Sequence, residues 1–163
     1  MAIIIFGLPG SGKSFLAQKL AEKINAMYIS SDLVRKELNK EVNYSEEQKL
    51  AVYEVMLQRA KNSHNHHTII DATFYKAGLR EWFEDELSEV NNTIYWIWVY
   101  ADDETSKKRT SHKRPDSDAD YQVYLKLKEQ FEPPCDNFLK LSSENEDVDN
   151  MIQQCLRYTG YDS

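Results

Sequence analysis

Disulfides and structural metal sites, two common supports of a small fold, have little basis in this sequence. It contains only two cysteines, Cys135 and Cys155, and neither belongs to a C-x-x-C pair. Two isolated thiols are most simply explained as reduced cysteines of an intracellular protein. His64, His66 and His67 lie close together but lack a fourth ligand at a recognisable spacing. We therefore interpret them as a solvated helix end rather than a metal site.

Long hydrophobic runs are also missing. The longest one, residues 93–101, is far too short to cross a bilayer, and the chain opens directly on an apolar segment. We therefore expect no membrane span and no signal peptide, and we predict a cytoplasmic location. A length of 163 residues fits one domain, so we predict a single domain over residues 1–163 with no obligate protein partner.

The chain has no excess of positive charge. Twenty Lys and Arg stand against 27 Asp and Glu, a formal net charge of −7. This balance argues against broad electrostatic binding to nucleic acids or anionic membranes, although it allows a local grip on one phosphate. Basic residues gather in one segment, namely Lys107, Lys108, Arg109, His112, Lys113 and Arg114. An ordinary solvated helix face is the alternative interpretation of this run.

Short apolar runs alternate with helical patterns, which predicts an α/β fold with a five-stranded, mainly parallel sheet and helices on both faces. The expected strands are 2–6, 27–29, 67–71, 93–100 and 138–141. Helical apolar spacing appears at Phe15, Leu16, Leu20 and Ile24, and again at Leu50, Val52, Tyr53, Met56 and Leu57. Trp96 and Trp98 belong to the fourth strand, where a core role is favoured over base stacking.

Three pairs of residues have the spacing of helix-capping boxes. They are Ser45 with Gln48, Ser117 with Asp120, and Ser143 with Glu146. In each pair the hydroxyl is placed to accept from a first-turn N–H, with an acidic or amide side chain three positions later. These pairs predict helix starts directly after residues 45, 117 and 143.

The most informative segment fits G-x-x-x-x-G-K-[ST] at every position. It reads Gly7-Leu8-Pro9-Gly10-Ser11-Gly12-Lys13-Ser14, and it joins the first expected strand to the first expected helix. In such a loop the backbone N–H groups surround the β-phosphate, the lysine reaches the β- and γ-phosphates, and the hydroxyl ligates Mg²⁺. The sequence therefore predicts binding of ATP with Mg²⁺, through Gly7, Pro9, Gly10, Ser11, Gly12, Lys13 and Ser14.

Two further constellations point to a reaction. Asp32 and Arg35 follow the second strand and share one face of a helix that starts near Ser31. A carboxylate there suits a general base, and the guanidinium suits an anionic acceptor; the alternative is an Asp that complements the helix dipole. The third strand ends in Asp71, the Walker B form, which would orient Mg²⁺ or its waters. Ala72 and Thr73 follow it where a motor ATPase has an acid, so fast hydrolysis is not favoured.

The basic segment 107–118 is placed to act as a helical lid. Arg109 and Arg114 precede Pro115 and a polar stretch. Arginines over the phosphates would neutralise charge on the transferred group, and a closing lid would exclude water.

Taken in order, these motifs resemble the P-loop kinases related to polynucleotide 5′-hydroxyl kinase and the zeta-toxin-like kinases. The resemblance covers roughly residues 2–131. It implies that Lys13 and Ser14 hold phosphates and metal, that Asp32 is the general base, and that Arg35 contacts a phosphate of the acceptor. It also implies that Arg109 or Arg114 contacts the donor phosphates, while Asp71 and Thr73 border the substrate site.

The expected activity is thus transfer of the γ-phosphate of ATP to a hydroxyl group. Among acceptors, a 5′-hydroxyl end of a nucleic acid is favoured modestly over a small metabolite or antibiotic. The rival class is a nucleotide-binding switch that transfers nothing. A GTPase switch is disfavoured because no Asn-Lys-x-Asp motif occurs.

Overall fold

The computed structural model describes residues 1–38, 45–90, 93–112 and 120–161. Its centre is a five-stranded sheet in the order β2-β3-β1-β4-β5, in which every pairing is parallel. The strands are β1 (Ala2–Phe6), β2 (Met27–Ser30), β3 (Thr68–Ala72), β4 (Ile94–Tyr100) and β5 (Phe138–Ser142). The predicted sheet is confirmed, with no strand boundary displaced by more than about one residue.

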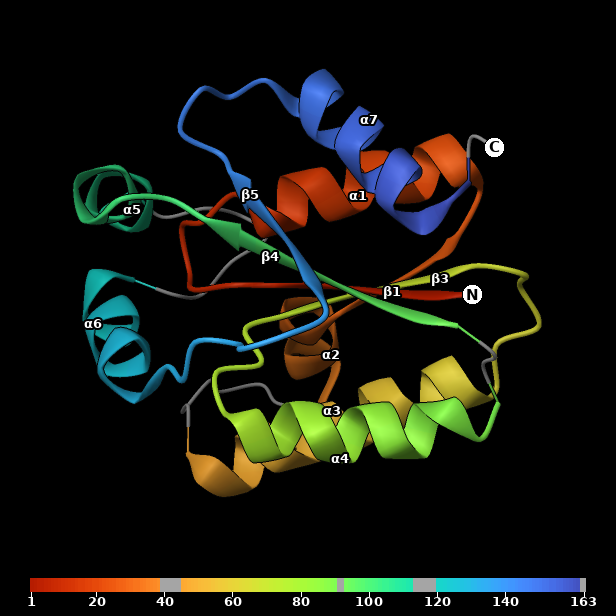
Figure 1. Ribbon diagram of the computed structural model, residues 1–163. Helices are drawn as coiled ribbons and strands as arrows, with labels where there is room; N and C mark the ends of the chain where they lie inside the picture. The colour runs from red at the N-terminus through yellow and green to blue at the C-terminus, as the bar shows by residue number, and fades with distance from the viewer. Residues whose placement is uncertain (39–44, 91–92, 113–119, 162–163) are drawn as a thin grey trace.

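Helices cover both faces of the sheet (Figure 1). They are α1 (Lys13–Ile24), α2 (Ser31–Leu38), α3 (Glu46–Lys61), α4 (Ala77–Ser88), α5 (Asp103–Thr110), α6 (Tyr121–Gln130) and α7 (Val148–Thr159). Helices α1 and α7 lie on one face and α3 and α4 on the other, while α5 and α6 flank the edge where the strands end. No helix in the described ranges is long and apolar enough to cross a membrane.

The central strand divides the interior into two cores. Ala2, Ile4 and Phe6 pack toward α3 and α4, whereas Ile3 and Ile5 pack toward α1 and α7. Because successive side chains of a strand point to opposite faces, β1 is apolar at every position and fully buried. This rigid strand leads directly into the loop at residues 7–12.

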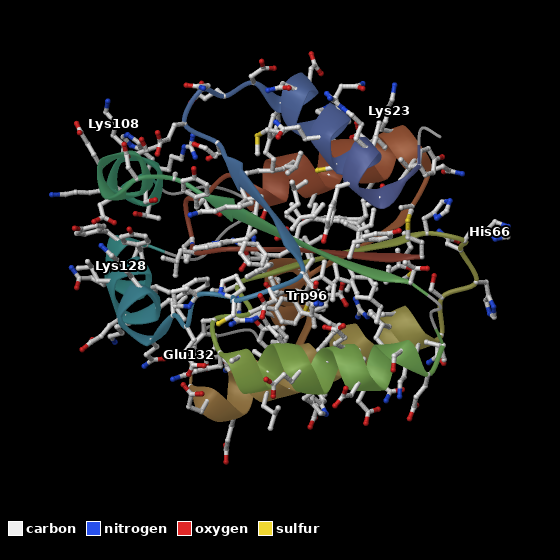
Figure 2. All side chains as sticks on the ribbon, in the orientation of Figure 1. Lys23, His66, Trp96, Lys108, Lys128 and Glu132 are labelled. Carbon is white, nitrogen blue, oxygen red and sulfur yellow. The ribbon has the colours of Figure 1, made fainter. Side chains whose placement is uncertain are left out.

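The core role predicted for the tryptophans is confirmed. Trp96 is buried between the sheet and α4, where its indole N–H donates to Glu84 at 2.8 Å (Figure 2). Trp98 is half-buried, and its ring stacks against Phe6 and Phe131.

Two apolar positions of the predicted helical repeats are not in the core. Phe15 is 58% exposed and Leu50 is 50% exposed. The buried residues of α1, from Leu16 to Ile24, form one stripe. At 100° per residue, Phe15 lies almost directly opposite the middle of this stripe. The apolar spacing was therefore correct for the helix, but not for this side chain.

One of the three predicted caps is confirmed. The Ser45 side chain accepts from the backbone N–H of Gln48 and caps α3. Asp120 itself caps α6, and Ser117 lies outside the described residues. The prediction for Ser143 is wrong: Asp147 caps α7, because the chain after β5 first makes a turn against the loop that follows β1.

Candidate nucleotide and acceptor site

The loop between β1 and α1 is enclosed by two other segments. Gly10 and Gly12 have φ angles of +76° and +88°, which a glycine adopts without strain. A Cβ on Gly10 would lie 3.0 Å from the Ser106 carbonyl oxygen of α5, and a Cβ on Gly12 would lie 3.0 Å from the Cβ of Ser143. Glycine is therefore required at both positions by conformation and by space.

The residues predicted to hold phosphate and metal lie at the start of α1. Gly12 is the N-terminal cap, Lys13 and Ser14 are the first helical residues, and both are half-buried. The first turn contains no acidic side chain. The positive end of the helix dipole and its N–H groups thus favour an anion here.

Asp71 is a buried carboxylate on which several groups converge. It is 1% exposed, and its Oδ2 accepts a hydrogen bond of 2.6 Å from the Tyr28 hydroxyl. Burial raises the pKa of Asp71, whereas the Lys13 charge, the hydrogen bond from Tyr28 and the nearby Ser14 hydroxyl lower it. The Asp32 charge acts weakly in the raising direction. The predicted site residues of three separate segments therefore act on one buried carboxylate.

This geometry fits a magnesium ion held jointly by protein and phosphate. Within the described residues, Oδ1 of Asp71 is buried without a hydrogen-bond partner. Those residues form no cluster of three or more acidic, histidine or cysteine ligands. Mg²⁺ is commonly held by one or two carboxylates with substrate phosphates and water, so Asp71 and the Ser14 hydroxyl are a suitable protein contribution.

Asp32 and Arg35 are brought together as their spacing predicted. They lie on α2, which begins at Ser31, and form an ion pair of 2.8 Å between Arg35 Nη1 and Asp32 Oδ1. Arg35 is largely buried, whereas Asp32 keeps more contact with solvent. The helix start places both near the edge of the sheet that carries the phosphate loop.

Among the described residues of the basic segment, Arg109 contacts the phosphate loop. Its Nη1 donates to the Gly10 carbonyl at 3.1 Å and to the Ser143 hydroxyl at 2.8 Å, and its Nη2 donates to the Ser143 carbonyl at 3.1 Å. The Ser143 hydroxyl in turn donates to the Ser11 carbonyl. Arg114 lies outside the described residues, as do residues 113–118 of the predicted lid.

The loop after β3 is tied to the segment after α6. Thr73 is half-buried, and the next residue, Phe74, has a φ of +45° that is strained for a bulky side chain. Arg80 is buried and donates to the carbonyls of Phe74 at 2.6 Å and Glu132 at 2.7 Å. Figure 2 shows Glu132 near the start of α4, where its side chain accepts from the Ala77 N–H.

Three residues of this site were missed by the sequence reasoning. Tyr28 gave no motif signal, because a tyrosine in a buried strand is ordinary. Arg80 lay in a helical pattern that gave no reason to expect burial. Ser143 fits the pattern of a helix cap, whereas its hydroxyl joins Arg109 to the phosphate loop.

Comparison with known proteins finds a matching family, a short stretch of sequence identity and similar folds. A protein-family model described as an AAA domain matches residues 3–134. Among curated proteins, adenylate kinase of Thermococcus sibiricus is 54% identical over 41 residues, which are 24% of this chain and 18% of that protein. The matching stretch is thus only about a fifth of the curated relative's length.

Solved structures resemble the chain over nearly its whole length. APS kinase CysC of Mycobacterium tuberculosis, in complex with AMPPNP and APS, has a TM-score of 0.75 at 15% identity, covering 98% of this chain and 96% of that one. A gluconokinase from Sinorhizobium meliloti 1021 gives 0.71 at 14%, with 98% and 91% covered. Kti12 of Chaetomium thermophilum, in complex with ADP-AlF3, gives 0.71 at 19%, with 97% and 98% covered. The fold is therefore that of the P-loop kinases.

Proposed function

This chain belongs to the AAA domain family, and we propose that it is a kinase that uses ATP and Mg²⁺ to phosphorylate a hydroxyl group. The observation that carries the proposal is the buried carboxylate of Asp71, on which Lys13, Ser14 and Asp32 all act electrostatically. The residues proposed to bind phosphate, those proposed to bind Mg²⁺ and the candidate base then border one space. This is the set of parts that phosphoryl transfer requires.

In the proposed reaction, the phosphate-loop amides and Lys13 hold the β- and γ-phosphates. Ser14 and Asp71 would hold Mg²⁺, which supplies charge neutralisation to the phosphates when bound. Asp32 accepts the proton of the acceptor hydroxyl as its oxygen bonds to the γ-phosphorus. The bond from the γ-phosphorus to the bridging oxygen breaks, and ADP leaves.

The remaining predicted residues orient the two substrates. Arg35 positions an anionic acceptor beside Asp32, and Thr73 borders the same space on the β3 side. Arg109, and Arg114 of the lid, stabilise the negative charge of the transferring group. Arg109 now donates to Gly10 and Ser143, so its contact with phosphate requires a rearrangement of these hydrogen bonds.

For the acceptor we propose a 5′-hydroxyl nucleic-acid end, on the motif order of the polynucleotide kinase and zeta-toxin-like group. A small-molecule hydroxyl is the second candidate. It is favoured by the formal net charge of −7, which disfavours a long polyanion, and by fold neighbours named gluconokinase and APS kinase.

The decisive experiment incubates the protein with γ-labelled ATP and Mg²⁺ against 5′-hydroxyl RNA and DNA oligonucleotides, gluconate and APS. We expect label on an acceptor, and its loss in Asp32→Asn. Glu37→Gln is the matched control, because Glu37 is an exposed carboxylate on the same helix that pairs with Arg59. Lys13→Ala should abolish nucleotide use altogether.

Failure would take a recognisable form. If ATP binds and no acceptor on the panel gains label or raises ATP turnover, the kinase proposal is wrong for these classes. A shape change upon nucleotide binding, without transfer, would then favour the switch.

A further inference from the structure

Tyr28 and Asp71 are joined across two neighbouring strands. The parallel pairing of β2 with β3 sets Tyr28 opposite Ile69 and Ser30 opposite Asp71. Side chains that alternate along these strands bring Tyr28, Ser30 and Asp71 to the face that α1 covers. The Tyr28 hydroxyl donates to Asp71 Oδ2 at 2.6 Å, which is a short, charge-assisted hydrogen bond.

Two polar side chains lie near the phenol hydroxyl. They are Gln18 of α1 and Ser30 of β2, and both act on Tyr28 electrostatically. The position of the donor is therefore set by the strand register and by its hydrogen bond to Asp71.

The two oxygens of Asp71 have different surroundings. Oδ2 is used by Tyr28, whereas Oδ1 is buried without a hydrogen-bond partner in the described part of the chain. An unsatisfied buried carboxylate oxygen is costly, which makes an absent ligand the simplest explanation. Lys13 and Ser14, the start of the phosphate site, act on the same carboxylate.

We propose that Tyr28 is a positioning residue of the metal site: its hydroxyl holds one oxygen of Asp71 so that the other is presented to Mg²⁺ or a metal-bound water. The inference rests on the proposed use of ATP with Mg²⁺, but not on the identity of the acceptor. Partners of this kind orient metal-ligating carboxylates, and their removal typically costs 10- to 100-fold in metal affinity.

A purely structural role is the competing explanation. Tyr28 could serve only to satisfy a buried carboxylate, in which case its removal would weaken the fold and affect nucleotide binding equally with and without metal. A positioning role predicts that only the increase in nucleotide affinity caused by Mg²⁺ is lost.

The test is calorimetric titration of AMPPNP into the protein, once with Mg²⁺ and once with EDTA. In Tyr28→Phe we expect the affinity in EDTA to remain close to that of the original protein, and the gain from Mg²⁺ to fall by about tenfold or more. Tyr95→Phe is the matched control, because Tyr95 lies on the same face of the sheet and packs against Tyr158. Tyr95→Phe should keep the full increase in AMPPNP affinity that Mg²⁺ gives the original protein.

The proposal would be overturned if Mg²⁺ raised AMPPNP affinity equally in Tyr28→Phe and Tyr95→Phe. It would also be overturned if Tyr28→Phe lost as much affinity in EDTA as in Mg²⁺. If Tyr28→Phe does not fold, Gln18→Leu removes a polar side chain that acts on the phenol and should reduce the same gain in affinity. Because no acceptor is present, this outcome is independent of phosphoryl transfer: a selective Mg²⁺ defect without any kinase activity would refute the proposed function alone.

Discussion

Arg35 holds Asp32 in an ion pair of 2.8 Å, with side chains only 8% and 19% exposed. The two residues are three positions apart on α2, so the pairing follows from helical geometry. Because the candidate base and the candidate acceptor-binding residue contact each other, their roles are not separable. A change at Arg35 alters the setting of Asp32 as well.

The first prediction therefore concerns Arg35→Ala. We expect the acceptor KM to rise, and kcat to fall by about 10- to 100-fold, because Asp32 loses the partner that fixes its position. The KM for ATP should change little. Steady-state kinetics with both substrates varied measures all three quantities.

Arg59→Ala is the matched control for this variant. Arg59 also pairs with a carboxylate of α2, Glu37, but at an exposed site. Arg59→Ala should leave kcat and the acceptor KM near their original values. A rise in acceptor KM with unchanged kcat would show that Asp32 is oriented without Arg35.

The second prediction concerns the fork of hydrogen bonds from Arg109. Arg109→Lys keeps the charge but cannot reproduce donation to Gly10 and to both oxygens of Ser143. We expect nucleotide affinity to fall about tenfold, because the loop that binds phosphate loses its tie to α5. Titration with AMPPNP measures the change.

Lys108→Ala supplies the comparison for Arg109. Lys108 belongs to the same basic run, and Figure 2 shows it pointing away from the phosphate loop. Its removal should leave nucleotide affinity unaltered. If Lys108→Ala weakens nucleotide binding and Arg109→Lys does not, the positive charge of the segment determines affinity and the hydrogen bonds of Arg109 do not.

The structural features that depend on a local sequence pattern were predictable from the sequence. The parallel sheet, the phosphate loop and the Asp32–Arg35 pair all follow from periodicity, a dense motif or a spacing within one helix. Tyr28 and Ser143 could not be found in this way. Tyr28 reaches Asp71 across 43 positions and Ser143 reaches Ser11 across 132, and such pairings depend on strand register and loop path. A single sequence does not specify either.

The third prediction concerns Asp103, which links the two helices beside the site. It accepts from Lys128 at 2.6 Å and from the Tyr124 hydroxyl at 2.8 Å, so α5 is tied to α6. These contacts lower the pKa of Asp103 below its ordinary value of 3.8. The ionised form is thus favoured by folding, and its contribution is present above about pH 4 and lost as pH falls further.

We therefore expect Asp103→Asn to increase amide hydrogen exchange of residues 121–130 at neutral pH by about 2- to 5-fold, the range of an exposed ion pair. Glu104→Gln, in the same turn, should have no such effect. As pH falls through the lowered pKa of Asp103, the original protein and Asp103→Asn should come to exchange alike in this helix. A difference that persists at low pH would mean that the carboxylate charge is not what ties α6 to α5.

The fourth prediction concerns the two thiols, which the fold makes unequal. Cys135 is exposed, whereas Cys155 is buried in α7, and burial raises the pKa of its thiol to about 12. The thiolate is the reactive form, so Cys155 should be inert at pH 8 in the folded protein. A disulfide-exchange reagent should titrate one thiol rapidly in the native state and two after denaturation. Cys135→Ser should remove the rapid reaction entirely while keeping one thiol in the denatured chain. Rapid native reaction of Cys135→Ser would show that α7 opens often enough to expose Cys155, and that the core between α1 and α7 is less tightly closed than its buried residues indicate.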